Sequence, residues 1–145
     1  MFTACKGQSF ILNSRHMELF FLVGRLLYGG YFVMSGINHF RHKQMMSEYG
    51  KTRGLSSPGP AILLSGILLI LAGASIVFGV WIKAAVTFLV LFLFLVSVIM
   101  HAFWRDTDPM AKMMNQVNFM KNMALLGAAL MLPMIAEPWR WSIQF

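Results

Sequence analysis

Residues 101–130, HAFWRDTDPMAKMMNQVNFMKNMALLGAAL, join the end of one apolar segment to the start of the next. Its first part contains histidine, arginine, aspartate, threonine and lysine side chains within a short predicted loop. It then carries Asn118, Lys121 and Asn122 into an apolar helix. Polar side chains inside an apolar segment mark a candidate site, because a membrane interior makes them costly. We therefore expect any functional site of this chain to lie here.

The composition is that of a membrane protein. Of 145 residues, 58% are hydrophobic and 12% are charged, which is too apolar for a small soluble domain. The net charge of +7 falls between apolar blocks, where basic residues serve anionic lipid and topology. We therefore expect membrane lipids as partners and no nucleic acid. The single cysteine, Cys5, excludes an internal disulfide.

Four apolar segments are long enough to cross a membrane as helices. We place them at about 17–40, 60–81, 83–104 and 118–136, with an interfacial segment at about 41–59. The turn at Lys83 is so short that the second and third spans must be antiparallel neighbours. The predicted fold is an all-α membrane four-helix bundle, one domain over 1–145 with both termini on the same side.

The segments outside the spans carry weaker signals. Residues 1–16 lack a small-residue cleavage site after a short apolar core, so we expect no removable signal peptide and an uncleaved first span. Met45, Met46 and Tyr49 among charged residues favour a short interfacial helix. A solvated loop is the alternative for this segment.

The loop before the fourth span carries a helix start signal. Asp108 directly precedes Pro109. Aspartate is a good N-cap residue, and proline fits the first turn, where its missing N–H costs nothing. We predict a helix cap here, with the fourth span following from about 118.

Positive charge predicts the orientation of the bundle. The terminal face holds four basic residues, and the other face holds seven: Arg41, Lys43, Lys51, Arg53, Arg105, Lys112 and Lys121. Because cytoplasmic loops carry the excess of lysine and arginine, we expect the loops at 41–59 and 105–117 in the cytoplasm.

Arg25 lies inside the first span, roughly 12 Å along the helix from Met17. A cation at this depth is costly unless it reaches the interface or finds a partner. Two interpretations stay open. Arg25 snorkels to the interface with Glu18 or Glu137 nearby, or it faces inward and binds an anionic or quinonoid group.

Two histidines close the first span. His39 and His42 are three residues apart and share a helix face, as at the start of a metal or haem site. No cysteine or carboxylate ligand lies nearby in sequence, so we expect no metal or haem, and favour interfacial hydrogen bonding.

The remaining polar residues of the spans converge at one end of the expected bundle. The end of the first span, the end of the third and the start of the fourth lie at the same face. A four-helix bundle can therefore place one polar mouth there, lined by His39, His101, Asn118, Lys121 and Asn122. Snorkelling and cap hydrogen bonds are the simpler explanation for the lysine and asparagines.

These residues also carry a family resemblance. GRLLYGGYFVMSGINHF at 24–40, HAFW at 101–104, Gln116 and NFMKNMALLGAAL at 118–130 together resemble the DoxX family of small four-span membrane proteins. The family's arginine, third-span histidine and Lys-Asn pair match Arg25, His101, Lys121 and Asn122. Many members also carry an acidic residue early in the second span, where this chain has Ile62 and Ser65–Gly66. This departure removes an internal counter-ion.

The resemblance implies a plasma-membrane protein linked to quinone oxidoreductases, because one branch of the family supplies a subunit of thiosulfate:quinone oxidoreductase. The sequence has no nucleotide-binding glycine motif and no cysteine cluster, so electrons must come from a partner. Our leading hypothesis is a membrane subunit that binds a quinone or similar amphipathic ligand beside a redox protein, using Arg25, His39, His101, Asn118, Lys121 and Asn122. The alternative is a non-catalytic adaptor or small transporter, since distant relatives serve as cargo receptors. Glycine and serine stripes permit a homo-oligomer.

Overall fold

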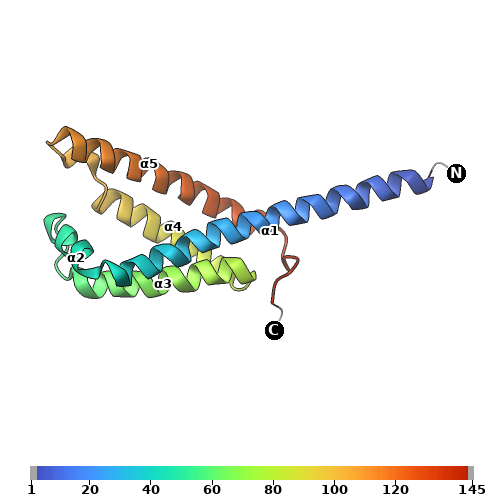
Figure 1. The fold of residues 1–145 in the computed structure, drawn as a ribbon, viewed down its shortest axis with the longest axis horizontal. Helices are drawn as coiled ribbons and strands as arrows, with labels where there is room; N and C mark the ends of the chain where they lie inside the picture. Colours follow the sequence, from blue (N-terminus) through green and yellow to red (C-terminus); the bar gives the residue numbers. More distant parts are fainter. Residues whose placement is uncertain (1–2, 144–145) are drawn as a thin grey trace.

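The chain is built from helices throughout the part that the computed structural model describes, which is residues 3–143, with side chains from residue 16 onward. This confirms the all-α prediction for that part. Figure 1 shows one layer made by α1 and α3 and a second made by α4 and α5. The elements in chain order are α1 (Thr3–Arg41), α2 (Lys43–Thr52), α3 (Pro58–Phe78), α4 (Ile82–Ile99), the 3₁₀ turn η1 (Phe103–Arg105), α5 (Pro109–Met131) and the 3₁₀ turn η2 (Leu132–Met134).

Four segments are long and apolar enough to cross a membrane, which confirms the predicted number and order of spans. They are His16–Arg41, Pro58–Phe78, Ile82–Arg105 and Pro109–Met134. The short helix expected between the first two spans is also present as α2. That both chain ends face one side of a membrane stays a prediction.

The fourth membrane-length segment begins earlier than predicted. We placed the span from about 118, and it begins with the helix α5 at Pro109. The cap itself is confirmed, because an Asp108 carboxylate oxygen accepts a hydrogen bond of 2.7 Å from the Ala111 N–H. Residues 110–117 contain three polar residues, Lys112, Asn115 and Gln116, among helix formers such as alanine and methionine. The cap therefore starts the helix at once, and the polar residues that suggested a loop belong to its first two turns.

The turn between α3 and α4 explains why these two helices are neighbours. Only residues 79–81 separate them. Gly79 ends α3 in the left-handed conformation with φ +73°, which glycine adopts without strain. A Cβ there would also lie 2.6 Å from the Ser142 side chain. The close approach of the two helices predicted from sequence is confirmed.

Helices α1 and α3 are in direct backbone contact through glycine. Gly29 and Gly36 on α1 face Gly73 and Gly66 on α3. A Cβ built on Gly29 would lie 2.6 Å from the Gly73 carbonyl oxygen, and one on Gly36 would lie 2.6 Å from that of Gly66. The seven-residue spacing on both helices, in opposite order, is that of an antiparallel pair. Small residues let helices approach closely where apolar burial gives little drive for association.

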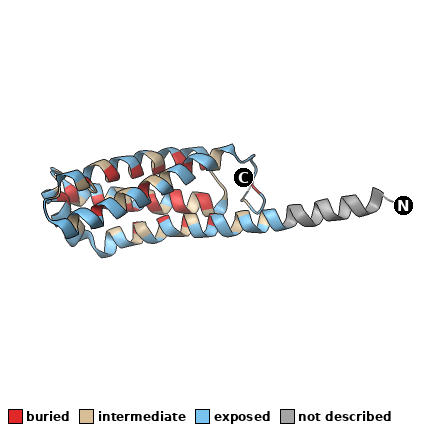
Figure 2. Cartoon of the chain, turned by 90° about the horizontal axis from the view of Figure 1, so that it is seen from above, coloured by how far each residue is buried: buried red, intermediate tan, exposed pale blue. Residues whose placement is uncertain are grey.

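The core lies around α3. Its buried residues Leu69, Ala72 and Ile76 pack with Phe32 of α1 and with the α4 residues Ala85, Leu89 and Leu93. Figure 2 shows the buried positions gathered on the inward faces of the helices. Helix α4 packs along α5, whereas α5 makes no close backbone contact with α1 within residues 3–143. The bundle is therefore a chain of neighbouring helices that leaves α1 and α5 apart.

This packing gives a test with a matched pair of adjacent glycines. Gly29→Ala places a methyl group against the backbone of α3 and should lower the free energy of unfolding by roughly 1–3 kcal/mol. A Cβ on Gly30 meets nothing within 4 Å, so Gly30→Ala should be neutral or stabilising by up to about 1 kcal/mol. Unfolding in mixed micelles measures both. Equal effects of the two substitutions would contradict the close contact.

Candidate functional site

Arg25 is buried at one end of the bundle, with 2% of its surface exposed. Its Nε donates to the Ile76 carbonyl at 3.2 Å, and one terminal nitrogen donates to the Val77 carbonyl at 2.6 Å. The other donates to the Arg140 carbonyl at 2.8 Å. These acceptors belong to the last turn of α3 and to the C-terminal segment. The guanidinium therefore caps a helix end, where the macrodipole favours a cation.

Aromatic rings cover the other faces of this guanidinium. Its central carbon lies 5.2 Å from the ring centre of Trp139 and 5.8 Å from that of Phe21, within the range of cation–π attraction. Glu18, which we expected near Arg25, pairs with Arg140 instead, at 2.7 Å. The expected pairing of Arg25 with Glu18 is therefore wrong. Arg25 faces inward, and three of its donor groups already have main-chain acceptors.

A polar network occupies the opposite end of the bundle and links α2 to α5. Arg53 donates to an Asp106 carboxylate oxygen at 2.8 Å and to the Tyr49 hydroxyl at 2.8 and 3.0 Å. The second Asp106 oxygen accepts from the Asn115 amide at 2.8 Å. His101 Nδ1 lies 3.1 Å from the Asn115 amide oxygen. We call these five residues the α2–α5 clamp.

The proton positions in the clamp follow from its acceptors. Asn115 donates its N–H to Asp106, so its oxygen accepts, and His101 must carry a proton on Nδ1. The Asn115 amide and then the Arg53 guanidinium lower the pKa of Asp106 below its ordinary value. Asp106 is therefore a carboxylate at neutral pH, and the clamp is closed.

Aromatic rings hold the η1 turn against α5 beside the clamp. Phe103 lies 5.6 Å and Trp104 5.8 Å from Phe119, in edge-to-face geometry. The two rings of η1 also contact each other at 5.1 Å. Such pairs favour edge-to-face packing. They fix the segment that carries Asp106 between α4 and α5.

Helix α5 turns a polar stripe inward. Its buried residues are Asn115, Asn122 and Ala129, spaced seven apart and therefore on one face. Asn122 is 6% exposed, and its amide has no hydrogen-bond partner among the residues whose side chains are described. Every fully enclosed polar atom in that part of the chain does have a partner. The Asn122 amide therefore borders open space and is not sealed in packed protein.

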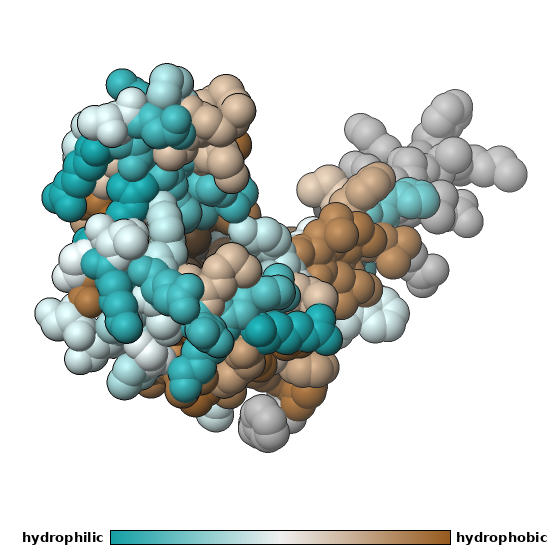
Figure 3. Space-filling model, turned by 60° about the vertical axis from the view of Figure 1, so that its left-hand side comes forward, coloured by the Kyte–Doolittle hydropathy of each residue, from teal (hydrophilic) through white to brown (hydrophobic). Residues whose placement is uncertain are grey.

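Asn122 lies near the place where α5 meets α1. Tyr28 of α1 donates to the Leu125 carbonyl of α5 at 2.6 Å, which joins the two helices one turn from Asn122. Beyond this bond, Figure 1 shows α5 diverging from α1 toward the α2 end. Figure 3 looks toward that end and shows polar side chains around a hollow. We call the region between α1 and α5, from Tyr28–Leu125 to the clamp, the α1–α5 gap.

Of the other predicted residues, His39 is half-buried and Lys121 is exposed. The His39 Nδ1 donates to the Ser35 carbonyl at 2.8 Å, and its ring lies 6.2 Å from that of Phe92 on α4. Lys121 donates to the Asn118 oxygen at 3.0 Å. Among the described side chains, no group of three or more histidine, cysteine, aspartate or glutamate residues comes together to hold a metal ion.

Residues 20–102 match the sequence model of the DoxX family. The match covers more than half of the chain. This chain belongs to the DoxX family. Together with the four membrane-length helices, this makes it a multi-pass membrane protein. No curated protein and no solved structure matches the chain.

Some of the candidate residues fall within the family match and others fall outside it. Arg25, His39 and the glycine contact of α1 with α3 fall within it. It ends at residue 102, so most of the 101–130 stretch lies beyond it. The match therefore does not include the polar residues of α5.

The clamp residues Tyr49, Arg53, Asp106 and Asn115 were absent from our predicted site. Tyr49 and Arg53 are four residues apart on α2, and Asn115 is seven residues before Asn122, so helical spacing was a usable signal for both pairs. Asn115 was missed because we assigned it to a loop. The Arg53–Asp106 pair spans 53 residues, and nothing local in the sequence links its members.

The clamp predicts an effect of pH and of one substitution. Asp106 has a depressed pKa in the folded chain, so its stabilisation is present above the ordinary carboxyl pKa of about 4 and is lost as pH falls through the folded value. Asp106→Asn should reproduce the acid state at pH 7. Hydrogen exchange of the backbone amides at 49–55 measures the release of α2.

The control for this experiment is Asp108→Asn in the same loop, because asparagine is an equally good helix cap. It should leave exchange at 49–55 unchanged. Unchanged exchange in Asp106→Asn as well would show that the clamp does not hold α2.

Proposed function

We propose that this DoxX protein is a plasma-membrane subunit that binds a quinone or similar amphipathic ligand and supports a quinone-linked oxidoreductase partner. The headgroup would lie in the α1–α5 gap against Asn122. One observation carries the proposal. The amide of Asn122, buried on a membrane-length helix, has no hydrogen-bond partner among the described side chains and backbone. A buried polar group left unpaired costs free energy unless a ligand or water satisfies it.

Asn122 and the aromatic residues of α4 together suit a flat ligand with an apolar body and polar carbonyl oxygens. The amide N–H is a donor for one such oxygen. The half-buried rings of Phe88 and Phe92 stack with centres 5.8 Å apart and give the core an aromatic surface on α4. Ligand sites are usually apolar cavities with a few polar groups that fix orientation, and this combination supports a quinone headgroup.

Two histidines supply proton-exchanging groups at the same end. His39 and His101 each donate Nδ1–H to a protein oxygen, so Nε2 remains an acceptor in the neutral ring. An imidazole ring can both donate and accept a proton, which suits it to proton transfer. In our proposal they exchange the protons that accompany quinone reduction, while Lys121 and Asn118 lie at the edge of the gap.

The electrons come from another protein. The sequence has one cysteine and no glycine-rich nucleotide motif, so the chain does not bind a flavin or iron–sulfur group by a recognised pattern. A bound quinone would supply the two-electron chemistry. The chain contributes the apolar site, the hydrogen bond and the route for protons.

The test is a pair of asparagine substitutions one turn apart. Asn122→Leu removes the donor and should weaken binding of a short-chain quinone by roughly tenfold, the value of about one hydrogen bond. Asn118→Leu disrupts only the exposed pair with Lys121 and should leave affinity unchanged. Quinone titration of the protein in lipid nanodiscs, followed by tryptophan fluorescence, measures both.

The alternative function predicts a different result. A non-catalytic adaptor or small transporter would show no quinone retained after purification and no difference between the two variants. It would also keep any partner-dependent electron transfer in His101→Ala and Lys121→Ala. Either result, in protein that unfolds like the native chain, would overturn the quinone proposal.

A further inference from the structure

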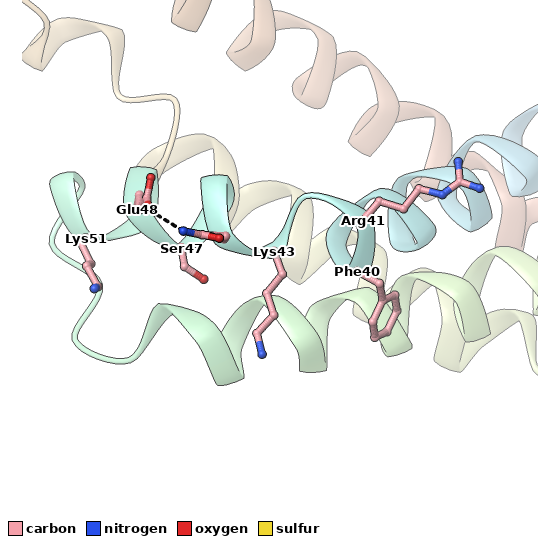
Figure 4. Close-up of a pocket in the computed structure, with 7 residues that line it drawn as sticks. Phe40, Arg41, Lys43, Ser47, Glu48 and Lys51 are labelled. Carbon is pink, nitrogen blue, oxygen red and sulfur yellow. Dashed lines mark hydrogen bonds between the residues drawn. The ribbon is translucent and has the colours of Figure 1, made fainter.

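A second polar site lies on the outer face of α2, away from the α1–α5 gap. It is a surface pocket of about 650 Å³ between the end of α1 and α2. Figure 4 shows Lys43 and Lys51 pointing to the same side, with Ser47 between them. Their spacing of four residues places these three side chains on one helix face. The lining is completed by Phe40, Arg41, Gln44 and Glu48.

The charge in this pocket is mainly positive and is not neutralised by the protein. Three cations and one carboxylate line it. The ion pairs of the described side chains are Arg53–Asp106 and Arg140–Glu18, so Arg41, Lys43 and Lys51 form none within that part. The single acid, Glu48, accepts from Gln44 at 3.4 Å. The pocket therefore attracts anions.

The pocket also has an apolar wall at the level where a membrane-length helix ends. Phe40, which is 42% exposed, is the last apolar side chain of the segment His16–Arg41. The buried Gly50, where a Cβ would lie 3.1 Å from Pro58, fixes α2 against the start of α3. Lys43 and Lys51 are exposed beside this contact and near the apolar end of α1.

We infer that this pocket binds the phosphate headgroup of an anionic phospholipid, between Lys43 and Lys51 with Ser47 as a hydroxyl donor. Unneutralised cations beside an apolar wall at the end of a spanning segment fit a ligand that has an anionic head and an apolar tail. Basic pockets of this kind on membrane proteins recognise lipid headgroups. The site is independent of the quinone proposal, since it uses none of the same residues.

The experiment compares two double variants that remove the same charge. Lys43→Gln with Lys51→Gln should weaken binding of phosphatidylglycerol roughly 20- to 30-fold, about fivefold for each lost ammonium group. Lys83→Gln with Lys112→Gln, which lie outside the pocket, should change it by less than about twofold. Full-length protein in detergent micelles, titrated with phosphatidylglycerol against phosphatidylcholine and read by native mass spectrometry, measures the bound lipid.

A variant that makes the pocket more positive separates an effect of charge from an effect of misfolding, because misfolding cannot tighten lipid binding. Glu48→Gln removes the only acid of the pocket and should tighten phosphatidylglycerol binding about fivefold. Equal losses in both double variants, or no gain in Glu48→Gln, would overturn the inference. Displacement of the lipid by inorganic phosphate at the same concentration would also overturn it, because the site would then bind a free anion rather than a lipid.

Discussion

The structure depends on one cation buried inside a membrane-length helix. Arg25 satisfies its guanidinium with main-chain carbonyls of α3 and of the C-terminal segment, and with two aromatic faces. Each hydrogen bond to a charged group contributes about 1.5–3 kcal/mol, and a buried charge without partners is far more costly. The cation therefore holds three parts of the chain together: the middle of α1, the end of α3 and the segment after α5.

The two ends of the bundle are held by different means, and the difference creates the candidate site. At the Arg25 end, Trp139 packs edge-to-face on Phe21 at 5.0 Å and the Ile143 N–H donates to the Phe78 carbonyl at 3.1 Å. At the other end, the polar residues of the clamp, of which Asn115 is buried, connect α2 to α5. Glycine contacts draw α1 onto α3 along their length. Since α5 packs on α4 instead, α1 and α5 diverge toward the α2 end (Figure 1).

The features that could be predicted from the sequence are those set by local residue pattern and by segment length. The four spans follow from apolar length, and the Asp108–Pro109 cap from side-chain chemistry. Small residues indicated close packing, but not that Gly29 would meet Gly73 and Gly36 would meet Gly66. The partners of Arg25 were out of reach, because main-chain carbonyls leave no mark in a sequence. We therefore expected a carboxylate partner for Arg25, but Glu18 forms its ion pair with Arg140. The polar stripe of α5 was half predicted: Asn122 was expected, and Asn115 was hidden by an incorrect loop assignment.

The most direct test of the role of Arg25 is hydrogen exchange of the Ile143 amide in Arg25→Lys, measured in lipid nanodiscs. Lysine keeps the charge but cannot donate in a fixed fork to three carbonyl groups. The account predicts faster exchange at Ile143 and in the last turn of α3, with exchange in α2 unchanged. Native protection of Ile143 in this variant would contradict it, because charge alone would then suffice and the main-chain bonds of Arg25 would not organise the fold.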